Sequence, residues 1–233
     1  MRSAALVMNC RRLAMLGLPL LASASALILV FAVWGTQFPS GSTPLEDFER
    51  YDNGAFPNRW RSRNDEARKI YRVEAETSGR FLRAHADKQA AQIGLDHVFE
   101  PKQQRRLTWR WRVHQLPTGA DERSADKHDA AAQVYVIFDN QYWPRVIKYI
   151  WSAALPVGTR FVNPLYGRSR VVVLRSGPGE KQQWRREEIN FYEDYKKFFD
   201  SEPSKVQGVG ILTSSDATKS VAIADYDDFV LLP

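Results

Sequence analysis

The chain has 233 residues, 44% of them hydrophobic and 26% charged, which is enough apolar material for one core and at most two domains. Its one cysteine, Cys10, lies near the N-terminus, which excludes an internal disulfide, a thiol nucleophile and a thiolate metal ligand in the folded part. The net charge of +6 does not indicate a nucleic-acid partner: without the three arginines before residue 13, the chain has 30 basic and 27 acidic residues.

Residues 13–34 form an uncharged run of 22 residues that follows Arg11 and Arg12. At 1.5 Å per residue, a helix of this length crosses a hydrocarbon core of about 30 Å. Two interpretations stay open for residues 1–34: a cleaved signal peptide and an uncleaved signal anchor. The anchor is favoured because the apolar run continues past the small-residue sites near 22–26. The basic flank predicts an exported remainder, periplasmic or at the outer face of the inner membrane, held to the membrane if the segment is not cleaved.

Residues 35–44 are rich in Gly, Pro, Ser and Thr and predict a linker, followed by one domain over residues 45–233. Period-2 alternation dominates this domain. It is clearest at 105–113, where Leu, Trp and Val alternate with Arg and Thr, and this predicts a strand with one buried and one cationic face. Other predicted strands lie at 69–75, 131–139, 145–151, 170–175, 206–214 and 221–232, with weaker candidates at 81–86 and 92–99.

One helix is predicted at about residues 191–200, where Asn190 can cap the first turn and Glu193 occupies the capping-box position. Many short strands, frequent turns and a single helix predict an all-β, two-sheet antiparallel sandwich of jelly-roll type, with the helix closing one end. A parallel α/β fold would need a crossover helix after most strands, and the sequence lacks them.

Several segments, in the same order, resemble one bacterial family, the domain of unknown function 3047. They are residues 107–113, 128–138, 149–151, 184–195 and 224–229. The resemblance spans residues 45–233 and implies no activity, because none is assigned to the family. The family pattern has an Asp-Asp pair and an Arg around the strand at 131–138, where this chain carries His128-Asp129 and Gln133. The layout is also similar to galactose-binding-like jelly rolls, a likeness of fold that does not imply function.

The loop at 139–144 is the first candidate ligand site. Tyr142 and Trp143 offer rings that can stack on a sugar, and Asp139 offers a carboxylate for its hydroxyls. The alternative is a hairpin loop whose Trp143 packs into the rim of the core.

A second candidate is the cationic strand face that carries Arg110 and Arg112. Guanidinium groups suit the carboxylate of an acidic glycan or the phosphate of a lipid head group. The alternative is a solvated face whose arginines pair with acidic residues on a neighbouring strand.

Two further clusters are acidic. His128, Asp129 and Asp126 precede a buried strand and offer an acid–base pair or part of a metal site, or else serve as turn residues. Glu49 and Asp228 lie near the first and last strands, and their pairing would bring oxygen ligands together for a structural Ca²⁺. Ordinary exposed strand charges are the alternative there.

Standard catalytic motifs are absent from the sequence. The leading hypothesis is therefore a non-catalytic, exported ligand-binding domain of the cell envelope, with a glycan as ligand. One alternative is a glycan-active enzyme that uses carboxylates near Asp129 and Asp139, and another is an envelope scaffold or interaction protein. A polar-rimmed groove around Trp143 favours binding, whereas two carboxylates converging in a cleft favour the enzyme.

Overall fold

Thirteen strands and two helices form the part of the chain that the computed structural model describes, residues 38–139 and 142–233. The predicted signal or anchor segment at 1–34 lies outside these residues. Within them, no helix has the length and apolar character needed to span a membrane.

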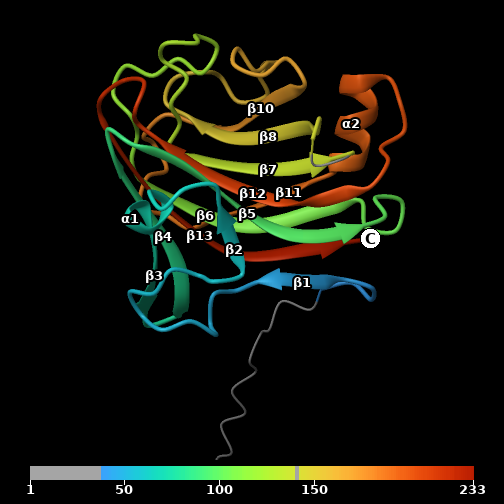
Figure 1. The fold of residues 1–233 in the computed structure, drawn as a ribbon, viewed down its shortest axis with the longest axis horizontal. Coiled ribbons are helices and arrows are strands. Elements are labelled where there is room, and N and C mark those ends of the chain that lie inside the picture. The colour runs from blue at the N-terminus through green and yellow to red at the C-terminus, as the bar shows by residue number, and fades with distance from the viewer. Residues whose placement is uncertain (1–37, 140–141) are drawn as a thin grey trace, which may run out of the picture. The chain divides into compact units, whose positions relative to one another are not determined.

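The strands form two packed sheets (Figure 1). The six-stranded sheet has the order β11 (Arg185–Ile189), β6 (Arg106–Gln115), β13 (Val221–Leu232), β4 (Gly79–Asp87) and β3 (Tyr71–Glu76), and β1 (Thr43–Glu46) also pairs with β13. The seven-stranded sheet has the order β2 (Trp60–Ser62), β5 (Ala90–Phe99), β12 (Val206–Ser214), β7 (Ala132–Phe138), β8 (Arg145–Ser152), β10 (Ser169–Ser176) and β9 (Arg160–Val162). The two-sheet, all-β prediction is confirmed.

The antiparallel prediction is wrong for one strand pair, because β10 runs parallel to β8. The chain leaves β8, passes through the short β9, which pairs antiparallel with β10, and returns to the end at which β8 began. A crossover of a dozen or more residues is long enough for a parallel connection, and it need not contain a helix.

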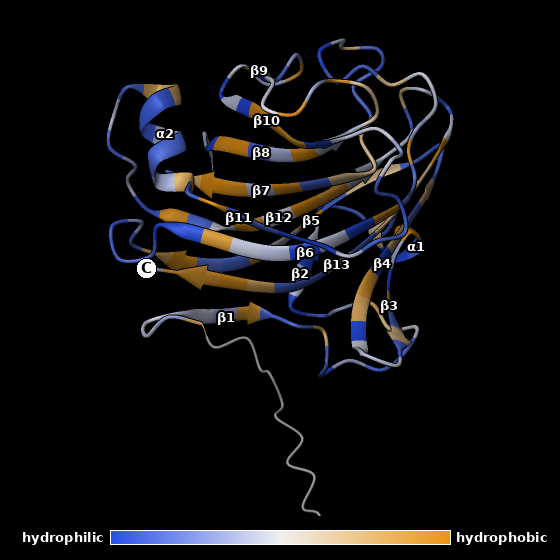
Figure 2. Ribbon diagram, turned by 180° about the vertical axis from the view of Figure 1, so that it is seen from behind, coloured by the Kyte–Doolittle hydropathy of each residue, from blue (hydrophilic) through white to orange (hydrophobic). Residues whose placement is uncertain are grey.

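Aromatic side chains join the two sheets. Trp109 and Trp111 of β6 are fully buried, as the alternation predicts. The Trp111 ring centre lies 6.1 Å from that of Trp151, and the Trp109 ring centre lies 6.2 Å from that of Tyr149, both on β8. Viewed from behind, the apolar colour is concentrated in strands such as β7 and β13 (Figure 2). The core therefore lies between the sheets and leaves their outer faces for other roles.

The predicted helix is confirmed as α2 (Phe191–Phe199). The Asn190 side chain accepts a hydrogen bond from the Glu193 backbone N–H at 3.0 Å, and Asp200 ends the helix with a left-handed φ of 48°. Figure 1 shows α2 beside one end of the strands. A second, four-residue helix, α1 (Ala67–Ile70), overlaps the start of the strand predicted at 69–75; the strand itself, β3, begins only at Tyr71.

Candidate functional site

The outer face of the seven-stranded sheet has a row of residues paired directly across four strands. Gly94 of β5, Gly210 of β12, Tyr135 of β7 and Lys148 of β8 are successive cross-strand partners. Directly paired residues point to the same face of a sheet. Because two of the four have no side chain, the row leaves open space beside Tyr135 and Lys148.

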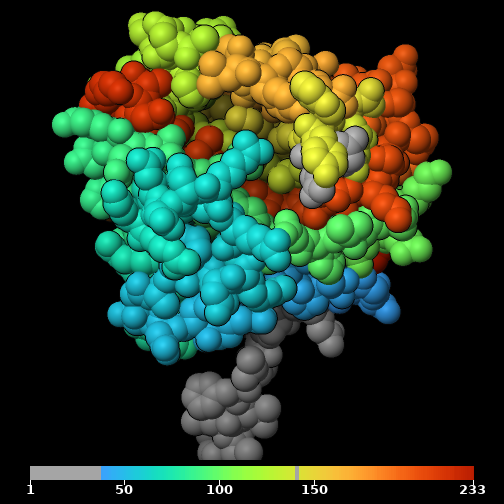
Figure 3. Space-filling model, in the orientation of Figure 1, coloured from blue at the N-terminus to red at the C-terminus, as the bar shows by residue number. Residues whose placement is uncertain are grey.

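A cavity of about 520 Å³ occupies this space, and we call it the groove. Its floor is formed by the strand residues Asp96, Tyr135, Ile137, Lys148 and Ser169, and residues outside the strands that line it include Arg63, Tyr142, Trp143 and Tyr166. Figure 3 shows the hollow between the cyan segment that follows β2 and the yellow segment that precedes β8. A volume of this size lies within the usual range of roughly 300–1,000 Å³ for small-molecule sites.

Two aromatic side chains at the rim of the groove are exposed to an unusual degree. Tyr142 is 80% exposed and Trp143 is 68% exposed. The Tyr166 hydroxyl donates a hydrogen bond to the Pro144 carbonyl at 2.7 Å, which anchors the chain just after Trp143. Trp143 is therefore largely exposed and does not pack into the rim of the core.

Asp139 supports the loop and does not line the groove. Its carboxylate accepts hydrogen bonds from the hydroxyls of Tyr195 at 3.2 Å and Ser204 at 3.0 Å. Arg145 and Arg168 lie 3.8 Å and 3.6 Å from its other oxygen. The sequence predicts Asp139 in one ligand site with Tyr142 and Trp143. In the structure, its carboxylate holds the end of β7 instead.

Lys148 places a positive charge in the floor of the groove. Its ammonium nitrogen lies 4.7 Å from the centre of the Tyr135 ring, a cation–π contact. Burial lowers the pKa of Lys148 to about 8. The Ser169 hydroxyl nearby is buried and has no hydrogen-bond partner among the described residues. The floor thus offers a cation and a hydroxyl to a bound molecule, and no signal in the sequence had distinguished either residue.

Because the pKa of Lys148 is lowered, this residue should make the free energy of unfolding rise with pH. Between about pH 8 and 10.5 the folded chain has lost this proton and the unfolded chain still holds it, so a rise in pH favours the fold. From pH 7.5 to 9.5 the Lys148 contribution to the free energy of unfolding should grow by about 2 kcal/mol. Urea unfolding of wild type and Lys148→Met measures it; an equal pH slope in both chains would contradict the assignment.

The arginines on the cationic face of β6 pair with acidic residues of a neighbouring strand, which was the alternative to ligand binding. Arg112 donates to Asp225 at 2.8 Å, and Arg110 forms an ion pair with Asp227. The guanidinium carbons of Arg110 and Arg112 also lie 4.7 Å and 4.4 Å from the centre of the Trp184 ring, which stacks over them. The prediction that Arg110 and Arg112 bind a ligand is therefore corrected. Both guanidinium groups already form ion pairs with acidic residues of the neighbouring strand β13.

Asp129 and Asp139, the two carboxylates of the enzyme alternative, do not lie close together. Asp129 precedes β7 and Asp139 follows it, and a seven-residue strand at about 3.3 Å per residue is roughly 20 Å long. A glycosidase pair is held at about 5–10 Å. Asp129 instead lies close to His128 and Asp216. The sequence analysis did not identify Asp216.

The acidic residues predicted to bind calcium are paired with arginines. Glu49 accepts a hydrogen bond from the Arg80 backbone N–H at 2.8 Å, and Asp228 lies 3.1 Å from both Arg110 and Arg186. Neither joins a group of three potential metal ligands in the described part of the chain. A calcium ion at Glu49 and Asp228 stays a prediction without structural support.

A sequence model of one protein family, described as "Protein of unknown function (DUF3047)", matches residues 58–230. The chain belongs to this family. The match confirms the resemblance seen in the sequence, and it extends from the turn before β2 into β13 of this DUF3047 member. No curated protein has a significant sequence match to the chain.

The solved structures that resemble this DUF3047 domain include three at 11% sequence identity. The family 11 xylanase from Neocallimastix patriciarum has a TM-score of 0.33, covering 81% of this chain and 98% of its own. The agarase AgWH50C has a TM-score of 0.34, covering 83% and 25%. The xyloglucanase domain of NopAA from Sinorhizobium fredii, in complex with cellobiose, has a TM-score of 0.36, covering 76% and 95%. With TM-scores below 0.5, these likenesses decide nothing about the function of this chain.

Proposed function

We propose that this DUF3047 domain is a non-catalytic glycan-binding module that acts outside the cytoplasm, in the cell envelope. One observation carries the proposal: the exposed rings of Tyr142 and Trp143 line the same cavity as Lys148 and Ser169, which offer it polar groups. A sugar ring has an apolar face that stacks on an aromatic ring and hydroxyls that need hydrogen-bond partners. The groove offers both within one hollow.

The charges of the groove favour an acidic glycan. Arg63 and Lys148 line it against a single acidic residue, Asp96, among the described residues. At pH 7 a lysine with a pKa of about 8 is still mostly protonated, so the floor is cationic. A carboxylate or sulfate on the ligand would therefore gain more from this groove than a neutral sugar.

The same set of side chains favours binding over hydrolysis. Glycoside hydrolysis uses two carboxyl groups placed on either side of the bond that breaks. Of the described residues that line the groove, Asp96 alone carries a carboxyl group, and it is exposed and lies 3.2 Å from Arg61. The carboxylate-dependent enzyme therefore remains the second candidate, without an observation in its favour.

Trp143→Ala should weaken glycan binding at least about tenfold, because it removes the stacking surface and leaves the floor intact. Isothermal titration of the full chain in mild detergent, against a panel of neutral and acidic envelope polysaccharides, measures this. Val157→Ala is the matched control, since Val157 is 64% exposed and does not line the groove. An absence of heat with every polysaccharide, or equal affinity in wild type and Trp143→Ala, would count against the proposal.

A further inference from the structure

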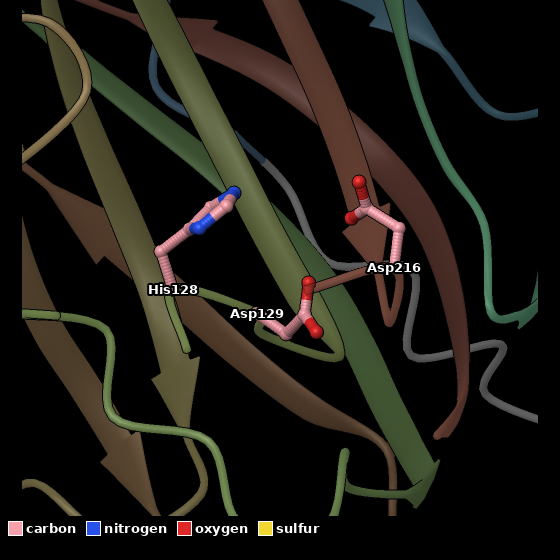
Figure 4. Close-up of side chains that lie close together, drawn as sticks. All are labelled: His128, Asp129 and Asp216. Atoms are coloured by element: carbon pink, nitrogen blue, oxygen red, sulfur yellow. The ribbon is translucent and has the colours of Figure 1, made fainter. Parts of the chain in front are cut away.

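A cluster of three metal-ligating side chains lies where β7 begins and β12 ends. His128 and Asp129 precede β7, and Asp216 follows β12, its antiparallel neighbour, so the two loops meet at one edge of the sheet. One ligand atom from each residue lies within 4.8 Å of the other two. In Figure 4 the imidazole of His128 and the carboxylates of Asp129 and Asp216 face one common space.

Both carboxylates have a buried oxygen without a hydrogen-bond partner. Asp129 is 0% exposed, and its Oδ2 accepts hydrogen bonds from the backbone N–H and the hydroxyl of Thr218, each at 2.7 Å. Its Oδ1 is buried and unpartnered among the described residues, and so is Oδ1 of Asp216. Buried polar atoms are nearly always satisfied, and an ionised oxygen is the most costly exception. Two unpartnered carboxylate oxygens in one cluster of potential ligands favour a bound cation.

The contacts of His128 leave one ring nitrogen available to a metal. Its Nδ1 lies 2.9 Å from the carbonyl oxygen of Ala125. A carbonyl only accepts hydrogen bonds, so Nδ1 is the donor, and in the neutral ring Nε2 then has a lone pair to offer a metal. Histidines that bind metals commonly donate their second nitrogen to a carbonyl in this way, and ligating carboxylates are commonly held by hydrogen bonds, as Thr218 holds Asp129.

We propose that His128, Asp129 and Asp216 bind one divalent transition-metal ion. Three atoms within 4.8 Å of one another always have a point at most about 2.8 Å from each, so shifts of less than an ångström give the ~2.0–2.2 Å distances of a zinc site. One imidazole and two carboxylates suit Zn²⁺ or Mn²⁺, whereas Ca²⁺ and Mg²⁺ prefer oxygen ligands alone. This set differs from the Glu49 and Asp228 site predicted for calcium.

The site is separate from the groove, because none of its three residues lines that cavity. It joins the loop before β7 to the loop between β12 and β13. A bound ion therefore stabilises the folded chain, since any ligand that binds only the native state raises stability.

The test uses the full chain, purified in mild detergent, stripped with EDTA and then dialysed. Titration with Zn²⁺ should give one binding event at this site and raise the melting temperature by on the order of 5 °C at saturation. His128→Gln and Asp216→Asn should each weaken this binding at least about tenfold. Both residues are only partly buried, so these variants avoid the folding risk of altering the fully buried Asp129. His85→Gln, an exposed histidine on the six-stranded sheet, is the matched control and should bind as wild type.

Parallel titrations with Mn²⁺ and Ca²⁺ test the choice of ion. Tighter binding of Zn²⁺ or Mn²⁺ than of Ca²⁺ supports the proposal. It is overturned if none of the three ions binds, if Ca²⁺ binds most tightly, or if His128→Gln and Asp216→Asn bind Zn²⁺ as the His85→Gln control does.

Discussion

Asp225→Asn is expected to lower the free energy of unfolding by about 3–5 kcal/mol, among the largest effects of any single substitution in this chain. The Asp225 carboxylate is 0% exposed and lies between three cationic or titratable partners. It accepts hydrogen bonds from Arg112 at 2.8 Å and from Arg83 at 3.1 Å, and it lies 2.7 Å from His114 Nε2. Its neutralisation leaves two guanidinium groups partly buried without their shared counter-charge.

The effect should depend on pH in a defined direction. Burial alone would raise the pKa of Asp225, but hydrogen bonds from His114 and Arg83 outweigh burial and lower it. Its stabilisation is therefore present above the unfolded pKa of about 3.9 and is lost as the pH falls through the lower folded value. Urea unfolding should show a large difference between wild type and Asp225→Asn at pH 7 and a smaller one near pH 3.

The matched control for Asp225 is Asp96→Asn. Asp96 pairs with Arg61 at 3.2 Å, but both side chains are more than two-thirds exposed, and such pairs contribute about 0–1 kcal/mol. Equal losses in the Asp225 and Asp96 variants would contradict the view that burial makes the Asp225 network strong.

Gly208→Ala is expected to lower the free energy of unfolding by about 3 kcal/mol or more. A Cβ at this position would lie 2.2 Å from the Leu95 carbonyl oxygen and 3.2 Å from its carbonyl carbon. These are backbone atoms of the paired strand β5, so they cannot turn aside as a side chain can. The pairing of β5 and β12, already irregular between Val206 and Gly208, would have to shift along its length.

Gly94→Ala is the matched control for Gly208, on the opposite strand of the same pair. Its Cβ would meet only the Val209 carbonyl oxygen at 3.9 Å, which is an ordinary contact. Stability should change by less than about 1 kcal/mol, because alanine also restricts the unfolded chain. Chemical denaturation of both variants measures the two effects, and a stable Gly208→Ala chain would refute the close approach of the strands.

Local patterns were enough to predict most of the longer strands and α2, but not the short elements β2, β9, β11 and α1. Alternation at 105–113 placed Trp109 and Trp111 in the core because it depends only on the period of an extended chain. The helix over Phe191–Phe199 followed from Asn190 and Glu193, the cap and capping-box residues, which lie within one short segment. Neither prediction needed to know which strands are neighbours.

Which residues come together at the candidate sites depends on which strands are neighbours, and local patterns do not show this. Arg112 pairs with Asp225, which lies 113 residues away in the chain. The sequence alone therefore could not decide between ligand binding and an internal ion pair. Asp216 reaches His128 and Asp129 only because β12 pairs with β7. The open floor of the groove likewise requires Gly210 to lie opposite Tyr135, a register that no short motif encodes.

The most direct test of glycan binding in the groove is a nuclear magnetic resonance titration of the labelled full chain with the polysaccharide fragment that gives the largest heat. We expect the Trp143 indole N–H and the backbone amides around Tyr135 and Lys148 to shift, and the Arg110 and Arg112 guanidinium signals on the opposite sheet to stay in place. Shifts at those arginines, with Trp143 unmoved, would contradict this account.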